Sequence, residues 1–476
     1  MSQSYHQRTA YSRDTMRGGD LDWANQPWPF KRYPGVEPLE LPRPALPQGG
    51  FWPLALGWPP PTKGQAGLDL ERLSGLLALS AGLTAQSQGG VYLRAQASAG
   101  ALYPNELYLV SKGLPDLANG LWHYAPDRHG LRLLREGDLS GAVAAALGGP
   151  PRELSFLVSG VFWKSAWKYK TRAWRYCLLD GGHVLANLEL ALAASGLGQV
   201  LHLDFAEPPA QALLGLDPER EALLAGLSAG GEVAVGPPLD EPWQPPNEEP
   251  LSPREGRDPV IAEAAALGGL AAPAPAPEWP AGPKPIQAAR LEPALPRNGP
   301  DLGRVVAARR SRRNFLASPL ETGQLALLLN AALPADGPLG ATVLLGPGGE
   351  PEAGVYLWHA TERALEPVAN QDQRRAAALA CLGQMWVGSA ALNLVLWADP
   401  ERLERTAGAR GYRHAMLAAG RAGQRLYLAA TALGLGCCGV GAFYDSEMAG
   451  AALPPPKAEP LYLLAAGPVK GGAPPV

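Results

Sequence analysis

The chain has 476 residues, which at roughly 150 residues per domain corresponds to two large domains or three smaller ones. Hydrophobic residues make up 46% of it and charged residues 18%, so the composition allows large cores and excludes a disordered chain. The 41 Lys and Arg residues are balanced by 44 Asp and Glu, a formal charge of −3, which argues against a general nucleic-acid-binding protein.

A proline-rich arm begins the chain. Residues 1–61 contain 11 prolines and large aromatic residues such as Trp23 and Trp28, which predicts a strap that wraps a domain surface. The first twenty residues are polar and have no signal-peptide core, and the longest uncharged apolar run, residues 387–398, is too short to span a bilayer. The four cysteines form neither a disulfide framework nor a paired CxxC zinc motif. We therefore expect a reduced, cytoplasmic protein with no metal and no membrane partner.

An internal repeat organises the rest of the chain. A shift of 238 residues places residues 154–205 on residues 392–443 without a gap, and 11 of the 27 positions from Arg172 to Gly198 are identical. This agreement is far above chance and identifies a tandem duplication. Two duplicated halves that pack about a pseudo-twofold axis would form a pseudo-dimer within one chain.

Each repeat is predicted to contain a buried strand followed by a long helix. The strands are expected at residues 154–161 and 392–398, and the helices at residues 173–195 and 411–433. Both helices end in Gly-Leu-Gly, where glycine supplies a left-handed C-cap. The apolar positions of the second helix form no single stripe, which predicts a helix buried on several sides.

A second proline-rich segment separates the repeats. Residues 237–300 contain 17 prolines, which favours extended polyproline conformations and an ordered strap or semi-rigid linker. We therefore predict an arm at residues 1–67, a first domain at residues 68–236, a linker at residues 237–300 and a second domain at residues 301–476.

The first repeat contains a loop of small residues, Ala97 to Pro104, ahead of a predicted strand. Small side chains and the Ser98 hydroxyl could line the edge of a cofactor, and a simple turn fits the same composition. On the long helix, His183 follows Asp180 by three residues and could form an acid–base pair with it. A structural helix histidine is the simpler interpretation.

A lysine cluster follows in the same repeat. Three of the nine lysines, Lys164, Lys168 and Lys170, lie within seven residues, and Tyr169 stands between two of them. Nearby cations can lower the pKa of lysine and tyrosine, which suits both residue types to proton transfer. The second repeat has Thr-Ala-Gly at residues 406–408 in place of Lys-Tyr-Lys, so such chemistry would belong to one repeat only. A basic surface loop is the alternative.

The second repeat contains an arginine-rich segment. Four arginines and a serine, residues 309–313, precede a predicted helix at residues 319–332. Guanidinium groups pair with phosphate oxygens, so the segment could form a phosphate site. A solvated run of charge has equal weight.

A glycine-rich segment follows the second long helix. Gly434, Gly436 and Gly439 formally match the dinucleotide-binding GxGxxG, but the segment follows a helix instead of joining a strand to a helix, so a Rossmann site is not expected. We predict instead that residues 434–443 allow the backbone to approach a planar ligand closely, because glycine has no Cβ to collide with it. A flexible helix cap is the alternative.

Together these segments resemble the nitroreductase superfamily of flavin enzymes. Arg309-x-Ser311-x-Arg313-x-Phe315 is similar to the family segment that grips the FMN phosphate and ribityl chain, and residues 434–443 are similar to the glycine loop beside the isoalloxazine. The chain is closer to the SagB-type branch, whose members include azoline dehydrogenases of peptide maturation. The resemblance implies an α+β fold of two tandem nitroreductase-like domains, each with a central mixed sheet flanked by helices. The segments that carry the likeness to the branch are Tyr5–Thr9, Asp22–Tyr33, Ser98–Pro104, Lys168–Arg175 and Asp180–His183.

The resemblance also implies one composite FMN site per chain. Family members bind FMN across a dimer interface, with the arginine motif of one subunit and the serine loop of the other, and here each motif survives in one repeat. The twin site is expected to be lost, because Gln199–His202 brings bulk where glycines should stand and Asp336–Gly340 lacks the serine. By resemblance, Lys168 and Tyr169 would be catalytic. The cofactor-binding residues would be Arg309, Ser311, Arg313, Ser98, Ala99, Gly100, Tyr103, Gly439, Val440, Gly441 and Ala442.

Three functions are open at this point. The first is FMN-dependent oxidation of a peptide-borne azoline to an azole, which the Lys-Tyr pair favours. The second is an NAD(P)H-dependent reductase of nitro compounds or quinones, acting on a small-molecule substrate. The third is a non-catalytic scaffold that holds flavin. The electron partner would be NAD(P)H or O2.

Overall fold

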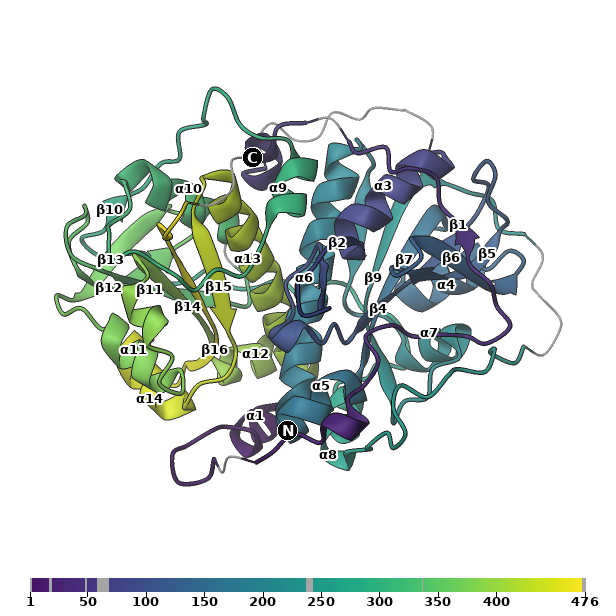
Figure 1. Cartoon of the computed structure of the whole chain (residues 1–476), viewed down its shortest axis with the longest axis horizontal. Helices are drawn as coiled ribbons and strands as arrows, with labels where there is room; N and C mark the ends of the chain where they lie inside the picture. Colours follow the sequence, from purple (N-terminus) through teal and green to yellow (C-terminus); the bar gives the residue numbers. More distant parts are fainter. Residues whose placement is uncertain are drawn as a thin grey trace. The chain divides into compact units, whose positions relative to one another are not determined.

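The computed structural model describes residues 2–16, 19–47, 49–57, 68–236, 243–335 and 337–472. The chain divides into two compact units. The first-repeat unit comprises residues 20–49 and 61–277, and the second-repeat unit comprises residues 1–19, 50–60 and 278–476. Each unit contains a seven-stranded sheet with helices packed on it, an α+β fold (Figure 1).

The sheet of the first-repeat unit has the strand order β1-β6-β5-β4-β7-β9-β8. Its central strands β4 and β7 are buried over most of their length, as expected of apolar runs covered on both faces. A separate hairpin is formed by β2 and β3. The strands are β1 (Leu39–Glu40), β2 (Leu83–Gln86), β3 (Tyr92–Arg94), β4 (Asn105–Ser111), β5 (Gly120–Ala125), β6 (Gly130–Glu136), β7 (Arg152–Val161), β8 (Gln199–His202) and β9 (Glu221–Glu232). The helices are η1 (Trp23–Asn25), α3 (Leu70–Ala81), η2 (Ala99–Ala101), α4 (Ser140–Leu147), α5 (Phe162–Tyr169), η3 (Lys170–Arg172), α6 (Ala173–Ala194), α7 (Glu207–Leu214) and α8 (Pro259–Ala266).

The sheet of the second-repeat unit has the order β10-β13-β12-β11-β14-β16-β15. Its strands are β10 (Ala289–Arg290), β11 (Gly340–Leu345), β12 (Gly354–His359), β13 (Ala364–Ala369), β14 (Leu392–Ala398), β15 (Gly436–Val440) and β16 (Glu459–Gly467). Its helices are α1 (Ser2–Arg8), α2 (Phe51–Ala55), α9 (Leu302–Ala308), α10 (Thr322–Ala332), α11 (Arg374–Ala380), η4 (Met385–Ser389), α12 (Pro400–Ala407), η5 (Gly408–Arg410), α13 (Gly411–Ala432) and α14 (Asp445–Ala452).

The two sheets confirm the duplication, because each strand of one order has its counterpart at the same place in the other. The predicted 238-residue shift also maps α5, η3 and α6 onto α12, η5 and α13, residue for residue at both ends of each helix. Neighbouring strands pair antiparallel in both sheets. At the edge of the second sheet, Ser311 forms an isolated parallel bridge with Cys437 of β15.

The long helices end as the glycine pattern predicts. Gly196 follows α6 with φ +70° and Gly434 follows α13 with φ +68°, both in the left-handed region. The amide of Leu435 then donates to the Ala430 carbonyl across 2.8 Å, which closes the last turn of α13. Within its own unit, α6 packs against α3, α5 and β7, and α13 packs against α10, α12 and β15.

One helical stretch among the described residues, Phe162–Ala194, is long and apolar enough to cross a membrane by length and composition. Its most apolar window is 83% buried inside the protein, as in the core helix of a folded domain.

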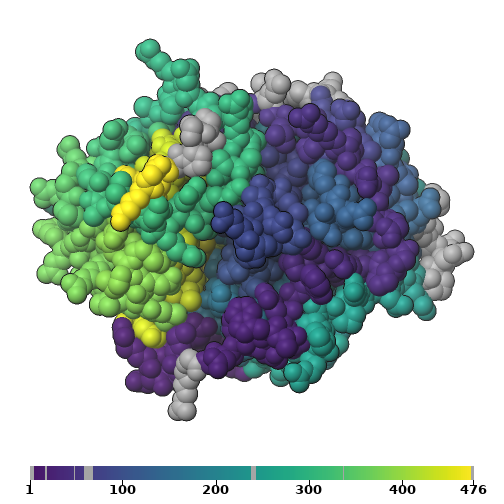
Figure 2. Space-filling model, viewed as in Figure 1, coloured from purple at the N-terminus to yellow at the C-terminus, as the bar shows by residue number. Residues whose placement is uncertain are grey.

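Both proline-rich segments are shared between the units. The described part of the linker contains α8, which belongs to the first-repeat unit, and β10, which pairs with β13 of the second. Arm residues 20–49 belong to the first-repeat unit, where the buried Lys31 pairs with Glu221 across 2.6 Å and with Glu248 across 2.5 Å. Purple arm segments lie on the surface beside the blue first repeat (Figure 2).

Candidate functional site

The arginine segment of the second repeat lies along the edge of the sheet. After α9 ends at Ala308, the chain is extended beside β15, where the amide of Arg312 donates to the Cys437 carbonyl across 2.9 Å. Alternate residues of an extended segment point to the same side. Arg309, Ser311 and Arg313 are therefore directed to one face of this edge.

Tyr427 of α13 connects this face to β15. Its hydroxyl lies 3.1 Å from the Ser311 hydroxyl and accepts a 2.7 Å hydrogen bond from the amide of Gly439. The Arg309 guanidinium carbon lies 5.5 Å from the centre of the Tyr427 ring. Burial raises the pKa of the Tyr427 phenol well above its usual value, so this hydroxyl stays protonated at neutral pH. The sequence offered no signal for Tyr427, because it is one aromatic residue among many apolar ones on a buried helix.

The two arginines of this face differ in burial. Arg309 is 3% exposed and Arg313 is exposed, with its guanidinium carbon 5.8 Å from the centre of the Trp386 ring. Arg310, between them in sequence, donates instead to the carbonyls of Ala307 and Arg309. Guanidinium and hydroxyl groups are donors that can pair with phosphate oxygens.

The glycine segment forms strand β15, and not the loop that we expected. A Cβ on Gly439 would overlap the hydroxyl of Tyr462 on the neighbouring strand β16, and a Cβ on Gly436 would overlap Val469. Packing within the unit therefore accounts for both glycines without a ligand. Gly441 and Ala442 follow the end of the strand and are half-buried. The roles of Gly439, Val440, Gly441 and Ala442 in holding a cofactor stay predictions.

In the first-repeat unit, the loop of small residues holds a strained backbone. Gly100, Ala101 and Tyr103 have φ values of +66°, +54° and +47°. Asp180 of α6 accepts hydrogen bonds from the Ser98 hydroxyl across 2.5 Å and from the Ala99 amide across 3.2 Å. Burial raises the pKa of the Asp180 carboxyl to about 7, against the lowering effect of these hydrogen bonds.

Two further contacts hold the other end of this loop. The amide of Tyr103 donates to the Ser98 hydroxyl across 2.9 Å, and the Tyr103 hydroxyl accepts from the amide of Arg94 across 3.1 Å. The Tyr103 side chain is 3% exposed, so it supports the loop from inside the unit.

The Lys-Tyr pair lies against the same loop. A Cβ placed on Gly100 would stand 3.1 Å from the Tyr169 hydroxyl and 3.2 Å from the Lys168 ammonium nitrogen. The Lys168 nitrogen is 5.6 Å from the centre of the Tyr169 ring, and that ring stacks on Tyr176 with the ring centres 4.0 Å apart. The structure thus brings together two motifs that are separated by more than sixty residues in the sequence. Glycine at position 100 leaves the space that the pair occupies.

The predicted lysine cluster separates into different environments. Lys164 is buried and forms an ion pair with Glu106, which also receives a 2.9 Å contact from His123. Lys170 donates to the Trp167 carbonyl across 2.8 Å at the end of α5. Of the three lysines, Lys168 supplies two of the three atoms nearest to a Cβ placed on Gly100.

The predicted remnant of the twin site occupies equivalent elements. Gln199–His202 forms β8, the edge strand that corresponds to β15. His202 there contacts the Ser228 hydroxyl across 2.5 Å. Of the other predicted wall, Asp336 lies outside the described residues. Over the described ranges, no group of three or more His, Cys, Asp or Glu residues is placed to hold a metal.

Most of the second repeat matches a known protein family. The nitroreductase family model, described as "Nitroreductase family", matches residues 306–467, which include the arginine segment and β15. A Methanocaldococcus jannaschii protein that carries the name nitroreductase MJ1384 is 34% identical to the chain over 158 residues. That match covers 30% of this chain and 80% of the relative.

A solved structure matches almost the whole chain. A protein from Anabaena variabilis described as a nitroreductase is 28% identical, with a TM-score of 0.79, over 98% of this chain and 99% of that one. The Escherichia coli microcin synthetase McbBCD complex with truncated pro-MccB17 bound matches 49% of this chain and 92% of that one, with 18% identity and a TM-score of 0.32. A likeness that distant carries no argument about chemistry.

Proposed function

The chain belongs to the nitroreductase family as a tandem duplication, and from this premise we propose that it is an FMN-dependent oxidoreductase of the SagB type with one flavin per chain. One observation carries the proposal. Ser311 and Arg309 lie against Tyr427, whose hydroxyl also accepts from the Gly439 amide, and Arg313, two residues beyond Ser311 on the same extended segment, lies over Trp386. This donor set fits a phosphate monoester.

The two repeats would contribute different parts of the flavin site. Arg309, Ser311 and Arg313 would hold the phosphate through charge-assisted hydrogen bonds. Ser98, Ala99 and Gly100 would border the flavin ring from the first repeat, with Tyr103 supporting their loop from inside the unit. Gly439, Val440, Gly441 and Ala442 would border the ring from the second repeat. When bound, FMN supplies the hydride chemistry, which no side chain of the protein can perform.

The protein itself would contribute a proton carrier, Lys168 or Tyr169, beside Gly100. Tyr169 and Lys168 both stand next to this residue, and the Lys168 ammonium nitrogen is 5.6 Å from the centre of the Tyr169 ring. In an azoline-to-azole oxidation one proton leaves the ring as hydride leaves the neighbouring carbon, so a base at this position is required. Asp180 would position the loop by holding Ser98 and Ala99.

Flavin reduction by NADH or NADPH and the activities of two variants distinguish the three functions. An NAD(P)H-dependent nitro or quinone reductase would have its flavin bleached quickly by NADH or NADPH, with no requirement for Tyr169. An azoline dehydrogenase would lose activity on Tyr169→Phe and on Lys168→Ala while keeping its flavin. A non-catalytic scaffold would show neither effect. We propose a cytoplasmic location for the enzyme, and a peptide or small molecule as its substrate with O2 or NAD(P)H as the electron partner.

The first experiment is to measure flavin per chain after heat release. We expect about one FMN per chain, and we expect Arg309→Ala to abolish binding because it removes a buried guanidinium of the phosphate set. Arg310→Ala is the matched control, since its side chain bonds to Ala307 and Arg309 carbonyls, and it should retain flavin. Ser98→Trp in the other repeat should also abolish binding. Two flavins per chain would contradict the single site, and no flavin after reconstitution with excess FMN would refute the proposed function.

A further inference from the structure

Lys164 is a buried cation on the helix that carries the Lys-Tyr pair. It lies in α5 one helical turn before Lys168, so the two side chains leave the same side of the helix. Lys168 is exposed and Tyr169 is half-buried, whereas Lys164 is 0% exposed. The place of the exposed pair therefore depends on what holds the buried part of α5.

The Lys164 ammonium contacts three segments of the chain outside its own helix. It pairs with the Glu106 carboxylate of β4, donates to the Pro29 carbonyl of the arm across 3.0 Å, and lies 3.5 Å from the Tyr103 carbonyl of the loop of small residues. A lysine ammonium has three N–H donors, so one donor can serve each of these oxygens. A single side chain thus ties the arm, the loop and the sheet to α5.

Two neighbouring side chains hold the same oxygen atoms. Arg94 also donates to the Pro29 carbonyl, across 2.7 Å, and His123 contacts the Glu106 carboxylate across 2.9 Å. Burial would raise the pKa of Glu106, but the Lys164 ammonium and the hydrogen bond from His123 hold this pKa well below its ordinary value. The carboxylate therefore stays ionised, and Lys164 is its buried counter-ion.

The helix and the loop meet at two points. The Lys164 nitrogen lies at the Tyr103 carbonyl, while Lys168 and Tyr169 stand at Gly100, three residues earlier in the loop. Four residues of an α-helix rise about 6 Å along its axis, so the two contacts are one turn apart. Rotation or sliding of α5 against the loop would break at least one of them.

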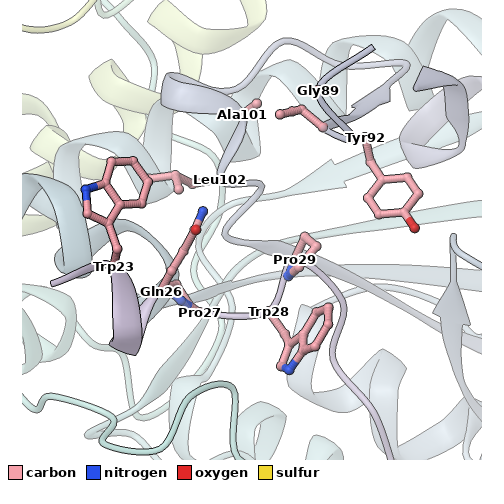
Figure 3. Close-up of a pocket in the computed structure, with 11 residues that line it drawn as sticks. Trp23, Gln26, Pro27, Trp28, Pro29, Gly89, Tyr92, Ala101 and Leu102 are labelled. Carbon is pink, nitrogen blue, oxygen red and sulfur yellow. The ribbon is translucent and has the colours of Figure 1, made fainter. Parts of the chain in front are cut away.

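Two of the segments that Lys164 joins form walls of one pocket. Pro29 of the arm and Leu102 of the loop both line a cavity of about 390 Å³ in the first-repeat unit (Figure 3). Tyr103, whose carbonyl faces Lys164, directly follows Leu102. A shift of α5 would therefore move a wall of this cavity together with the Lys-Tyr pair.

We propose that Lys164 is a positioning residue, which sets the register of α5 on the loop of small residues and so places Lys168 and Tyr169 at Gly100. Lys164 acts through the helix and not on the substrate itself. This inference rests on the proposed function, which makes Lys168 or Tyr169 the proton carrier.

The test variant combines Lys164→Met with Glu106→Gln, because removing Lys164 alone would leave a buried carboxylate without its cation. In the full-length protein, meta-fluorotyrosine replaces Tyr169, and its fluorine NMR resonance reports the surroundings of that ring. We expect the resonance to shift or broaden in the double variant. The matched control is Lys112→Met with Asp138→Asn, an ion pair of 2.7 Å in the same unit, which should leave the resonance in place.

The reaction is measured on the same proteins without the fluorine label. The probe is a synthetic thiazoline dipeptide amide, whose oxidation to the thiazole is followed by mass spectrometry. We expect kcat to fall by about 100-fold in the double variant, as a misplacement of about 1 Å can cause. The control variant should keep the wild-type kcat. Flavin per chain at saturating FMN should be the same in all three proteins, because the proposed phosphate set lies in the second repeat.

Circular dichroism shows whether each variant is folded. If the double variant does not fold, native-state hydrogen exchange on the wild type decides, since residues 99–103 and α5 should then open with one common free energy in low urea. An unmoved resonance or an unchanged kcat in a folded double variant, or two separate opening free energies, would overturn the positioning role. A shifted resonance in a protein that binds no FMN would refute the proposed function and support the placement of the pair by Lys164.

Discussion

At the scale of single residues, the loop from Ser98 to Tyr103 depends on one carboxylate and one glycine. Asp180 holds the start of the loop, and Gly100 leaves the space in which Lys168 and Tyr169 stand. The sequence indicated the loop and the Lys-Tyr pair, but not that they touch. Their contact depends on how α5 follows β7, which local patterns do not report.

Replacing Gly100 should disturb the pair specifically. In Gly100→Ala, the left-handed backbone costs about 1–2 kcal/mol and the new methyl group crowds the Tyr169 hydroxyl and the Lys168 nitrogen. Gly113→Ala is the matched control, because Gly113 has φ +73° and open space around its Cβ position. Urea unfolding should show a similar loss of stability in both variants, while oxidation of substrate should fall only in Gly100→Ala. Equal activities would contradict the placement of the pair at Gly100.

Asp180 should make stability depend on pH. Burial raises the pKa of this carboxyl to about 7 in the folded protein, whereas in the unfolded chain it titrates near its ordinary value of about 3.9. Between these values the folded state binds more protons, so the free energy of unfolding should fall as the pH rises from about 4 to about 7.

In Asp180→Asn the pH dependence that Asp180 adds to the free energy of unfolding should disappear. The asparagine amide keeps an acceptor for the Ser98 hydroxyl and does not titrate. Urea titrations at pH 5 and pH 8 on wild type and variant measure the difference. A pH dependence of the same size in both proteins would show that Asp180 is not the group responsible.

At the scale of elements, the ungapped repeat made the long helices predictable. α6 and α13 begin and end within a residue or so of the predicted bounds, because a duplication imposes the same length twice and the Gly-Leu-Gly end fixes the C-terminus. The glycine segment was not predictable in the same way. Glycine disfavours strands, and β15 forms because its backbone pairs with β16 beside the arginine segment.

The ends of α5 and α12 show where the repeats diverged. Lys170 adopts φ +50° and ψ −140°, and its counterpart Gly408 adopts φ +55° and ψ −150°. Only glycine enters this conformation without strain, so the first repeat maintains a strained lysine directly after Lys168 and Tyr169.

Exchanging the residues at these two positions should have opposite effects. Lys170→Gly relieves the backbone and should stabilise the protein by about 1 kcal/mol, after the loss of its hydrogen bond to Trp167. Gly408→Lys imposes the strain on the other repeat and should destabilise it by about 1–2 kcal/mol. Thermal unfolding of the two variants shows whether the melting temperature rises in Lys170→Gly and falls in Gly408→Lys. Destabilisation by Lys170→Gly would mean that the lysine side chain contributes more than the strained backbone costs.

At the scale of the whole molecule, the candidate site residues divide between the two units. The Ser98 loop, Lys168 and Tyr169 belong to the first-repeat unit, and the arginine segment and β15 belong to the second. The sequence predicted this division, because the arginine motif occurs only in the second repeat, and the serine loop and the Lys-Tyr pair occur only in the first. It did not predict that the arm would be shared, because proline content marks a strap without showing which core it covers.

If one flavin uses residues of both repeats, its binding should protect both from hydrogen exchange. On addition of FMN to flavin-free protein, we expect slower exchange at the amides of Ser98–Tyr103 and of Arg309–Arg313, because a ligand that binds only the folded form stabilises the elements it contacts. Peptides that cover β12 and β13 serve as the internal control and should not change. Protection confined to Arg309–Arg313 would contradict the shared site.

The single covalent chain has a consequence for how the protein behaves at low abundance. Two separate subunits that share a ligand lose it on dilution, because their association depends on concentration. Here the two units are parts of one chain, which passes from one unit to the other four times, at residues 19–20, 49–50, 60–61 and 277–278, so dilution does not separate them. The flavin content of the protein should therefore be the same at nanomolar as at micromolar protein, provided that free FMN exceeds its dissociation constant, and a cell could maintain the activity with very few copies.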